Sequence, residues 1–271
     1  MPELPEVETT CRGIEPHIIN SDIVDVVVRQ AKLRWPVPDD LSSHLLGRSV
    51  RRCYRRAKYL LLAFDTGTLV IHLGMSGSLR IICGDIAPSK HDHVDIVFAN
   101  GSVLRYHDPR RFGAVLWLEG GLNEHKLFAD LGPEPLDEDF CAEYMFERSR
   151  GRKTPIKSFI MDSHVVVGVG NIYANEALFI AGIRPQTLAG KVSKTRYTQL
   201  CAAIKAVLAK AIKQGGTTLK DFVGGDGKPG YFQQQLMVYG RAGQPCVQCD
   251  AVLKEIKIAG RSTVYCPRCQ R

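Results

Sequence analysis

The sequence lacks the features that would place it in a membrane or carry it through one. No apolar run approaches the roughly 18 residues that a membrane-spanning helix needs, and no signal segment opens the chain. These absences argue against a membrane protein and a secreted protein, so we expect a cytoplasmic location. The composition is 45% hydrophobic, which argues against a disordered chain.

The sequence also lacks a nucleotide-binding signature. Two glycines in Gly168-Val169-Gly170 precede a predicted helix that begins near Asn171, but no Gly-Lys-Ser/Thr ending follows them and no strand–GxGxxG unit occurs. We therefore expect no nucleotide cofactor. Backbone N–H groups at such a helix start still bind phosphate well, although two glycines before a helix are common and the motif alone is weak.

Acidic residues are scarce where basic residues gather. The 271 residues carry 36 Lys and Arg against 28 Asp and Glu, a formal net charge of +8. Between Arg29 and Lys58 there are nine basic residues and only two acids, Asp39 and Asp40. This density is typical of a surface that binds nucleic-acid phosphates, while a merely solvated face is the alternative.

The nine cysteines fall into two groups. Four are paired near the end, as Cys246-x2-Cys249 and Cys266-x2-Cys269, with sixteen residues between the pairs. This spacing predicts a four-cysteine ribbon around one structural Zn²⁺, because four thiolates leave no open coordination position. Two disulfides are the alternative, which a cytoplasmic location disfavours. The other five are expected to be reduced core residues: Cys11, Cys53, Cys83, Cys141 and Cys201.

The first half of the chain has the pattern of an antiparallel β-sandwich. Short apolar segments recur at close spacing, separated by turn residues such as Asp65-Thr66-Gly67 and Asn100-Gly101. An N-terminal helix would pack at the end or edge of this sandwich. The predicted strands are Ile23–Val28, Tyr59–Phe64, Leu69–Leu73, Val94–Phe98, Val103–Tyr106 and Ala114–Leu118.

Beyond Gly120–Gly121 the periodicity becomes helical. The predicted helices are Asp137–Arg148, Pro155–Met161, Ile172–Ile180 and Thr195–Gln214. The fold class is therefore α+β: an N-terminal helix with an antiparallel β-sandwich (1–130), a helical domain (131–240) and a zinc ribbon (241–271). Residues 217–235, rich in glycine, predict a mobile loop or a plain linker.

The N-terminal stretch Met1–Glu8 is a candidate for amine chemistry. Methionine followed by a small residue favours removal of Met1, which would leave the amine of Pro2 free. An α-amine has a pKa of about 8 against about 10.4 for lysine, so more of it is neutral at pH 7. The helix predicted to follow would disfavour a cationic amine at its positive end, and Glu3 lies next to it to move protons. A capped helix start without chemistry is the alternative.

That helix has a clear apolar face. Val7, Thr10, Cys11 and Ile14 recur at the spacing of one helical face. Pro5 and the acidic Glu6 and Glu8 suit its first turn.

Three more stretches in the first half carry candidate residues. Arg55-Arg56-Ala57-Lys58 precedes a predicted strand, so Lys58 can reach a phosphate from the strand start. The glycines of His72–Ser78 favour a tight turn that can present Met75 outward, although a methionine is more often a core residue. His107–Gly113, the sequence HDPRRFG, predicts a loop in which arginines adjoin an aromatic ring, which suits stacking and insertion between bases.

Together these motifs resemble one enzyme family. MPELPEVET, HDPRRFG, VGVGNIY and the four-cysteine tail are similar to bacterial formamidopyrimidine-DNA glycosylases, also called 8-oxoguanine DNA glycosylases. The resemblance covers both ends and most of the middle of the chain. It implies a monomeric glycosylase and AP lyase that excises oxidised purines from damaged double-stranded DNA, with a helix–two-turn–helix domain and a loop that closes over the extruded base.

The resemblance also implies roles for single residues. Pro2 is the nucleophile that attacks C1′, Glu3 is essential and Glu6 helps order the site. Lys58 and His72 contact backbone phosphates, and Arg261 and Asn171 bind phosphates beside the lesion. Lys58 and Arg261 are also assigned to the catalytic residues. The implied DNA-binding set is completed by the gap-filling residues and their neighbours: Met75, Arg110, Arg111, Phe112 and Lys157.

Two rival readings stay open. Endonuclease VIII has the same nucleophile, fold and zinc ribbon but prefers oxidised pyrimidines; Leu4, where that relative typically has glycine, and the complete set of Met75, Arg110 and Phe112 argue against it. A non-catalytic zinc-ribbon protein that only binds DNA is the second rival. The presence of both Pro2 and Glu3 argues against that.

Overall fold

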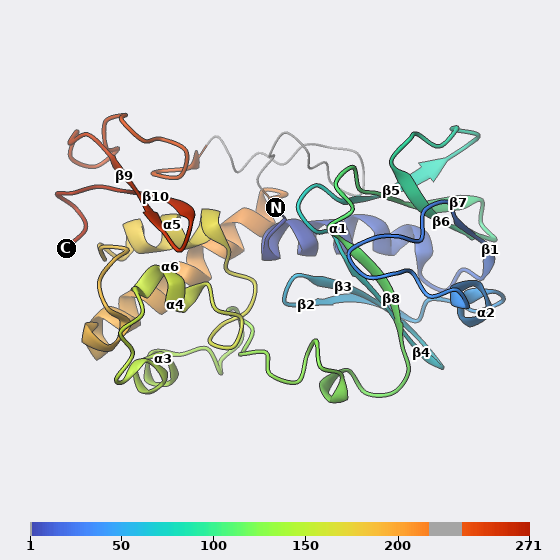
Figure 1. Cartoon of the computed structure of the whole chain (residues 1–271), viewed down its shortest axis with the longest axis horizontal. Helices are drawn as coiled ribbons and strands as arrows, with labels where there is room; N and C mark the ends of the chain where they lie inside the picture. The colour runs from blue at the N-terminus through green and yellow to red at the C-terminus, as the bar shows by residue number, and fades with distance from the viewer. Residues whose placement is uncertain (1, 217–234) are drawn as a thin grey trace. The chain divides into compact units, whose positions relative to one another are not determined.

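The computed structural model describes residues 2–216 and 235–271, which form two compact units (Figure 1). The first unit runs to Ala129 and takes in residues 214–216, and the second comprises Asp130–Lys213 and residues 235–271. The glycine-rich loop predicted over residues 217–235 lies outside the described residues except for its last position. The division into three domains at residues 130 and 240 stays a prediction.

The first unit is an antiparallel sandwich with a helix at its start. Its two four-stranded sheets have the strand orders β1-β6-β7-β5 and β2-β3-β4-β8. Its elements are α1 (Leu4–Ile18), β1 (Ile23–Val28), α2 (Leu41–Leu45), β2 (Arg52–Arg56), β3 (Tyr59–Phe64), β4 (Gly67–His72), β5 (Ser78–Cys83), β6 (Asp92–Phe98), β7 (Ser102–His107), β8 (Ala114–Leu118) and the 3-10 turn η1 (Leu122–Glu124).

Helix α1 closes one open edge of the sandwich. It packs against β2 and β5, the edge strands of the two sheets, and also reaches β3 and β7 (Figure 1). The predicted apolar face is the one that it buries: Val7, Thr10, Cys11 and Ile14 are at most 5% exposed. The prediction that the N-terminal helix packs at the edge of the sandwich is therefore confirmed.

Burial in the core accounts for which strands could be predicted from the sequence. Strands β3 and β4 lie inside their sheet, pair in register from Tyr59↔His72 to Phe64↔Gly67, and carry long apolar runs. Strands β2 and β5 were not predicted: β2 is mostly charged (RCYRR), and Arg80 interrupts the apolar residues of β5 (SLRIIC). The other two edge strands, β1 and β8, are largely apolar and were predicted. Cys83 corrects one prediction: it is exposed at the end of β5 rather than in the core, and Cys141 is half-buried.

The second unit is helical and ends in a two-stranded hairpin. Its helices pack chiefly through α5 with α6 and α3 with α6. Its elements are α3 (Ala142–Ser149), α4 (Ile156–Ile160), α5 (Asn171–Ile180), the 3-10 turn η2 (Ala189–Lys191), α6 (Lys194–Lys213), β9 (Lys254–Ile258) and β10 (Arg261–Tyr265).

Three of the four predicted helices begin and end within two residues of the observed bounds, and one does not. Helix α3 begins at Ala142 instead of Asp137. The five residues before it form turns, because the Asp137 N–H donates to the Glu134 carbonyl (3.2 Å) and Phe140 is fully buried. The prediction from helical periodicity therefore placed the helix start five residues too early.

Candidate functional site

The first turn of α1 fixes the residues around Pro2. Glu3 is the N-cap, and it forms a capping box with Glu6: the Glu3 N–H donates to a Glu6 carboxylate oxygen (2.8 Å), and the Glu3 side chain accepts from the Glu6 backbone. Both glutamates are 2% exposed and Pro2 is buried as well. The start of the helix is thus held by hydrogen bonds and shielded from bulk water.

Glycine at position 216 approaches the same turn. A Cβ on Gly216 would lie 3.1 Å from a Glu6 carboxylate oxygen, and its φ of +79° is unfavourable for other residues. The predicted helix Thr195–Gln214 ends just before Gly215-Gly216, where glycine suits a helix end. The structure adds a second need for glycine there, because the chain passes close to Glu6.

Two contacts hold α1 against strand β2. The Glu8 carboxylate accepts from Arg55 Nε (2.9 Å), and it also binds Arg12 on its own helix (2.7 Å). Below this pair the Cys11 and Cys53 thiols touch (2.9 Å), and contact with Cys11 together with burial raises the pKa of the Cys53 thiol. These contacts set where the helix carries Pro2 relative to the sandwich.

Lys58 lies in the turn that joins β2 to β3. Ala57 adopts a left-handed φ of +55°, which makes the turn tight and leaves Lys58 as the residue before Tyr59 of β3. The prediction that Lys58 sits at a strand start is confirmed in position. The side chain is half-buried.

His72, at the end of β4, is held as a neutral donor. Burial, helped by the charges of Arg34 and Lys58, lowers the pKa of His72 to about 4. Its Nδ1 accepts the Gly74 N–H (3.1 Å), so the ring proton is on Nε2. Sequence reasoning counted His72 as a phosphate contact without identifying its charge, which only the buried environment determines.

Two loops present the three side chains that were predicted to fill a gap in DNA. Met75 is 41% exposed and Phe112 is 47% exposed, so Met75 is not the core residue that averages would suggest. The Arg110 guanidinium lies over the Phe112 ring, 5.0 Å from its centroid. Arg110 and Arg111 are also exposed, and Arg111 turns the loop with a φ of +56°.

Asn171 is the first residue of α5 in the second unit, directly after the N-cap Gly170. Within the described part of the chain its Oδ1 is buried without a hydrogen-bond partner. Asn175, one turn further on, donates to the Asn171 carbonyl (2.6 Å) and accepts the Val264 N–H (2.9 Å). The helix start is thereby tied to the hairpin strand β10.

Lys157 lies beneath the same hairpin. Its side chain is 1% exposed, and its ammonium donates to the Ser262 carbonyl (2.9 Å) and the Thr263 hydroxyl (2.7 Å). Arg261 precedes these two residues and is exposed at the tip of the β9–β10 hairpin, directly after the turn Ala259-Gly260. A hollow of about 190 Å³ lies beside Lys157 and Arg261.

A further buried carboxylate was missed by sequence reasoning. Glu176 on α5 accepts three consecutive backbone N–H groups, from Met237, Val238 and Tyr239 (2.8–2.9 Å). It is fully buried, and this burial raises its pKa although the three N–H groups oppose the shift. No short motif could reveal this role, because the partners lie about sixty residues away.

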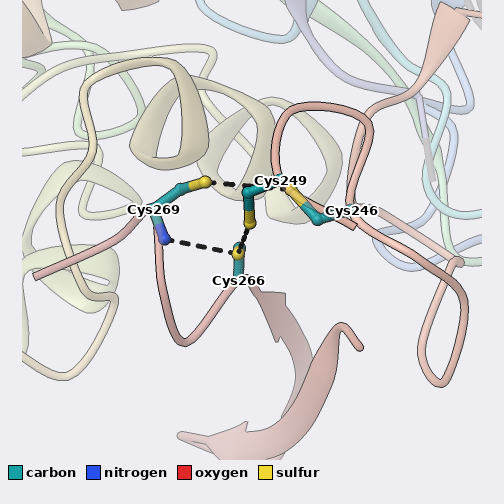
Figure 2. A group of neighbouring side chains, drawn as sticks. All are labelled: Cys246, Cys249, Cys266 and Cys269. Carbon is teal, nitrogen blue, oxygen red and sulfur yellow. Dashed lines mark hydrogen bonds between the residues drawn. The ribbon is translucent and has the colours of Figure 1, made fainter. Parts of the chain in front are cut away.

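The four paired cysteines form a metal site (Figure 2). Their sulfurs all lie within 4.8 Å of one another, with Cys246–Cys269 at 3.9 Å and Cys249–Cys266 at 3.5 Å. A tetrahedron with Zn–S bonds of about 2.3 Å has sulfurs about 3.8 Å apart, so the residues fit one Zn²⁺. Backbone N–H groups of Gln248 and Cys269 point at two of the sulfurs (3.4 and 3.3 Å). The zinc prediction is confirmed.

Each unit thus collects its own share of the predicted residues. The first unit holds Pro2, Glu3 and Glu6 at one helix start and the exposed loops around Met75 and Phe112. The second holds Asn171, Lys157 and Arg261 around the zinc ribbon. No helix in the described part of the chain is long and apolar enough to cross a membrane.

This combination defines a class of protein. A sandwich unit opened by a buried, capped N-terminal helix occurs with a helical unit that ends in a four-cysteine zinc ribbon. Exposed arginine and aromatic side chains on the first unit suit contact with nucleic-acid bases. The class is that of zinc-ribbon enzymes that act on nucleic acid.

Comparison with known protein families identifies the family. Three family models match: the formamidopyrimidine-DNA glycosylase N-terminal domain over residues 1–115, the H2TH domain of the same enzymes over residues 131–223, and a zinc finger found in FPG and IleRS over residues 243–271. The chain is 59% identical over 271 residues to the formamidopyrimidine-DNA glycosylase of Marinobacter nauticus and 58% identical to that of Cellvibrio japonicus, with 100% of each chain covered.

Solved structures agree with the family models. The Fpg protein of Thermus thermophilus matches with a TM-score of 0.89 and 37% identity, over 99% of this chain and 98% of the other. A variant of the Lactococcus lactis Fpg protein bound to DNA containing Fapy-dG matches with a TM-score of 0.93 and 34% identity over 100% of both chains. The chain belongs to the formamidopyrimidine-DNA glycosylase family.

Proposed function

We propose that this DNA glycosylase, which removes oxidised purines from DNA in base-excision repair, uses the amine of Pro2 as its nucleophile after Met1 is removed. The observation that carries the proposal is the rigid, buried first turn of α1, where Pro2 and Glu3 lie side by side. The positive end of a helix disfavours protonation of an adjacent amine. The amine is therefore poised to act as a nucleophile at neutral pH.

The chemistry follows from an amine attacking a sugar carbon. The Pro2 nitrogen forms a bond to C1′ of the damaged nucleotide as the glycosidic bond breaks and the base departs. Glu3 exchanges protons with the opening sugar, and because Pro2 is a secondary amine the product is an iminium ion between its nitrogen and C1′. The iminium ion acts as an electron sink, so the 3′ and then the 5′ phosphate leave by successive eliminations, which is the AP lyase activity.

Glu6 serves this reaction by fixing the backbone of Pro2 and Glu3. Its carboxylate accepts the Glu3 N–H (2.8 Å), so the backbone that carries Pro2 and Glu3 has one conformation. A nucleophile held in one geometry gains much of the advantage of an intramolecular reaction.

DNA is bound by groups from both units. Lys58 and the neutral Nε2–H of His72 contact phosphates on the first unit, and Arg261 and the start of α5 at Asn171 contact phosphates beside the lesion. Lys157 supports Arg261 indirectly, because its ammonium donates hydrogen bonds to the two residues that follow Arg261 in β10. The zinc keeps that ribbon folded and takes no part in bond breaking.

Met75, Arg110 and Phe112 take the place of the extruded nucleotide. The glycosidic carbon is inaccessible inside the stack, and glycosylases flip their target nucleotide out at a cost of a few kcal/mol. Met75 fills an irregular gap, Phe112 wedges between bases, and the Arg110 donor fork hydrogen-bonds the orphaned base. Arg111, exposed beside them, adds positive charge for the backbone.

The partner is damaged double-stranded DNA, and the enzyme works as a cytoplasmic monomer. Solved relatives of the chain are complexes with Fapy-dG DNA and with DNA containing an abasic site. The excess of basic residues between Arg29 and Lys58 suits such a polyanion.

Oxidised pyrimidines are the second candidate substrate. A complex of the Lactococcus lactis Fpg protein, 34% identical to this chain, contains an oxidised pyrimidine in its DNA. The complete gap-filling set of Met75, Arg110 and Phe112 favours purines as the main substrate.

Borohydride trapping separates these possibilities. The enzyme lacking Met1 is mixed with duplexes that contain 8-oxoguanine or 5-hydroxycytosine, and the covalent adduct is measured. Faster trapping with 8-oxoguanine supports oxidised purines, and faster trapping with 5-hydroxycytosine supports the second candidate. The same protein with Met1 retained is the control, and full trapping by that blocked form would refute Pro2 as the nucleophile.

A further inference from the structure

The loops that carry the gap-filling side chains touch each other through their backbones. A Cβ on Gly74 would lie 2.5 Å from the backbone of Phe112 and Gly113. A Cβ on Gly113 would overlap the Tyr106 hydroxyl and the His72 carbonyl. Glycine at both places lets the loop around Met75 and the loop around Phe112 lie in direct contact.

One carboxylate lies under this contact and bonds to both loops. Asp108 is 0% exposed. Its Oδ1 accepts the Ser76 hydroxyl (3.2 Å) and the Arg110 N–H (3.3 Å). Its Oδ2 accepts the Tyr106 hydroxyl (3.2 Å) and the Gly113 N–H (2.9 Å). The four donors match the four lone-pair sites of an ionised carboxylate.

Three of the four donors lie next to the side chains proposed to insert into DNA. Ser76 follows Met75 directly, while Arg110 N–H and Gly113 N–H bracket the segment that ends in Phe112. The hydroxyl of Tyr106 remains a donor, because burial and the nearby Asp108 carboxylate raise the pKa of Tyr106. The loops therefore share one acceptor group.

The backbone of Asp108 is fixed as well. His93 Nε2 bonds to the Asp108 carbonyl (2.7 Å), the Arg111 N–H donates to the same carbonyl (3.3 Å), and the Asp108 N–H donates to the His91 carbonyl (3.0 Å). The carboxylate is thus a fixed point and not a mobile side chain. Bonds to it hold a loop in one place.

We propose that Asp108 is a positioning residue that joins the two loops, so that Met75, Arg110 and Phe112 enter the DNA as one rigid set. The inference rests on the proposed roles of these three side chains. Insertion of separately mobile side chains would lose conformational entropy at the moment of flipping, whereas a preformed set has already lost it on folding. Asp108 itself touches neither DNA nor the reacting atoms.

An amide at this position cannot satisfy the same donors. Each carboxylate oxygen faces two of them, so the NH₂ group of Asp108→Asn meets a hydroxyl and a backbone N–H in either orientation. At least one backbone N–H then loses its acceptor, and one loop is released. The substitution changes the hydrogen bonds and the charge with almost no change in volume.

The experiment compares base flipping and excision, which need the three side chains to enter the DNA, with the lyase step on an abasic site, which depends on them less. Excision of 8-oxoguanine opposite cytosine is measured in single turnover, flipping is followed by 2-aminopurine fluorescence beside the lesion, and the lyase rate is measured on a pre-formed abasic duplex. For Asp108→Asn we expect excision and flipping to slow about tenfold, since each lost hydrogen bond is equivalent to several-fold in rate. The abasic lyase rate should change less than about threefold.

Asp92→Asn is the matched control. Asp92 is also buried, at 7% exposure, and binds His107, the last residue of β7 (2.7 Å), the Ser89 N–H (2.6 Å) and Arg105 (3.8 Å), none of which lies in the Met75 turn or the Arg110–Phe112 segment. It should leave the ratio of excision rate to lyase rate unchanged. Equal effects of Asp108→Asn and Asp92→Asn on that ratio would overturn the proposal.

Milder variants keep the test valid if Asp108→Asn does not fold. Ser76→Ala removes only the bond on the Met75 side, and Tyr106→Phe removes one bond to Oδ2 together with the contact of the same hydroxyl to the His72 carbonyl (3.3 Å). Each should slow flipping severalfold more than it slows the lyase step. An unchanged ratio in both would overturn the proposal.

Variants of the inserting side chains tell two failures apart. If Met75→Ala and Phe112→Ala slow flipping while the Asp108, Ser76 and Tyr106 variants do not, only the positioning role of Asp108 is wrong. If Met75→Ala and Phe112→Ala leave flipping unchanged, the proposed function of those side chains is wrong, and the role of Asp108 is refuted with it.

Discussion

At the scale of single residues, His72 shows how burial changes the meaning of a sequence motif. A histidine near phosphates suggests a cation, yet burial lowers the pKa of His72 to about 4. Its Nδ1 is occupied by the Gly74 N–H (3.1 Å). The group that it can offer to a phosphate is therefore the neutral Nε2–H.

This state predicts a pH dependence of stability. The pKa of His72 is about 4 in the folded chain and 6.5 in the unfolded chain. The unfolded chain therefore binds more protons between these values, and stability falls as the pH drops from 6.5 to 4. In urea unfolding, the free energy of unfolding of the wild type should fall by about 2 kcal/mol more than that of His72→Gln between pH 7 and pH 4.5. Parallel losses in the two proteins would contradict the neutral buried state.

Arg110 predicts which base is accepted opposite the lesion. Cytosine offers O2 and N3 to a donor fork, whereas adenine offers N1 beside a competing amino group. Arg110→Ala should therefore reduce the preference for cytosine over adenine about tenfold, within the 1–3 kcal/mol of a bidentate contact. Lyase activity on an abasic duplex should be mostly kept.

Single-turnover excision with either base opposite 8-oxoguanine measures this preference. An unchanged ratio would mean that Arg110 does not read the opposite base, and an equal collapse of the lyase rate would place it in the chemistry. Arg12→Ala is a control, because Arg12 is an exposed arginine on α1 with no contact to the loop.

The residues that the sequence revealed are those that form short motifs. Pro2, Glu3 and the four cysteines are identifiable because their neighbours in sequence are also their partners. Asp108 is different in one partner: Tyr106, Arg110 and Gly113 are its neighbours in sequence, but Ser76, through which it reaches the second loop, lies 32 residues earlier. The acceptor role of a residue cannot be predicted when the donors are supplied by the tertiary fold.

At the scale of elements, apolar strands were predictable from the sequence and a mostly charged strand was not. β3 and β4 were predicted because both of their faces carry apolar side chains. β2, with the sequence RCYRR, buries only Cys53 and is defined by its pairing with β3. Charged edge strands protect a sheet against further pairing, and that protection removes the apolar pattern by which strands are recognised.

The zinc ribbon is the element with the most direct test. Cys249→Ser removes one of four ligands, and structural zinc contributes folding free energy directly. We expect loss of bound zinc and duplex affinity at least about tenfold weaker, because the β9–β10 hairpin carries Arg261. Zinc content by mass spectrometry and duplex affinity by fluorescence anisotropy measure the two effects.

Cys83→Ser is the matched control for that variant. Cys83 is exposed at the end of β5 and belongs to the first unit, so zinc content and duplex affinity should both be unchanged. Undiminished affinity of Cys249→Ser would contradict a zinc that folds the ribbon for DNA binding, and a water ligand on the metal of the wild type would show that the zinc is not purely structural.

At the scale of the whole molecule, the residues with predicted roles are distributed over two units. The first unit holds Pro2, Glu3, Glu6 and the exposed loops around Met75 and Phe112, and the second holds the helix start at Asn171 and the zinc ribbon. The α+β class, the sandwich and the ribbon were all predicted from the sequence. The return of residues 214–216 to the first unit after the helices of the second was not predicted, because it depends on tertiary contacts.

The central claim is that the Pro2 amine forms the bond to the damaged nucleotide. The most direct measurement is borohydride reduction of the enzyme with an 8-oxoguanine duplex, followed by proteolysis and mass-spectrometric mapping of the modified peptide. The account predicts a single adduct, on the nitrogen of Pro2 in a chain that lacks Met1. An adduct on a lysine side chain such as Lys58, or an adduct formed while Met1 is still present, would contradict it.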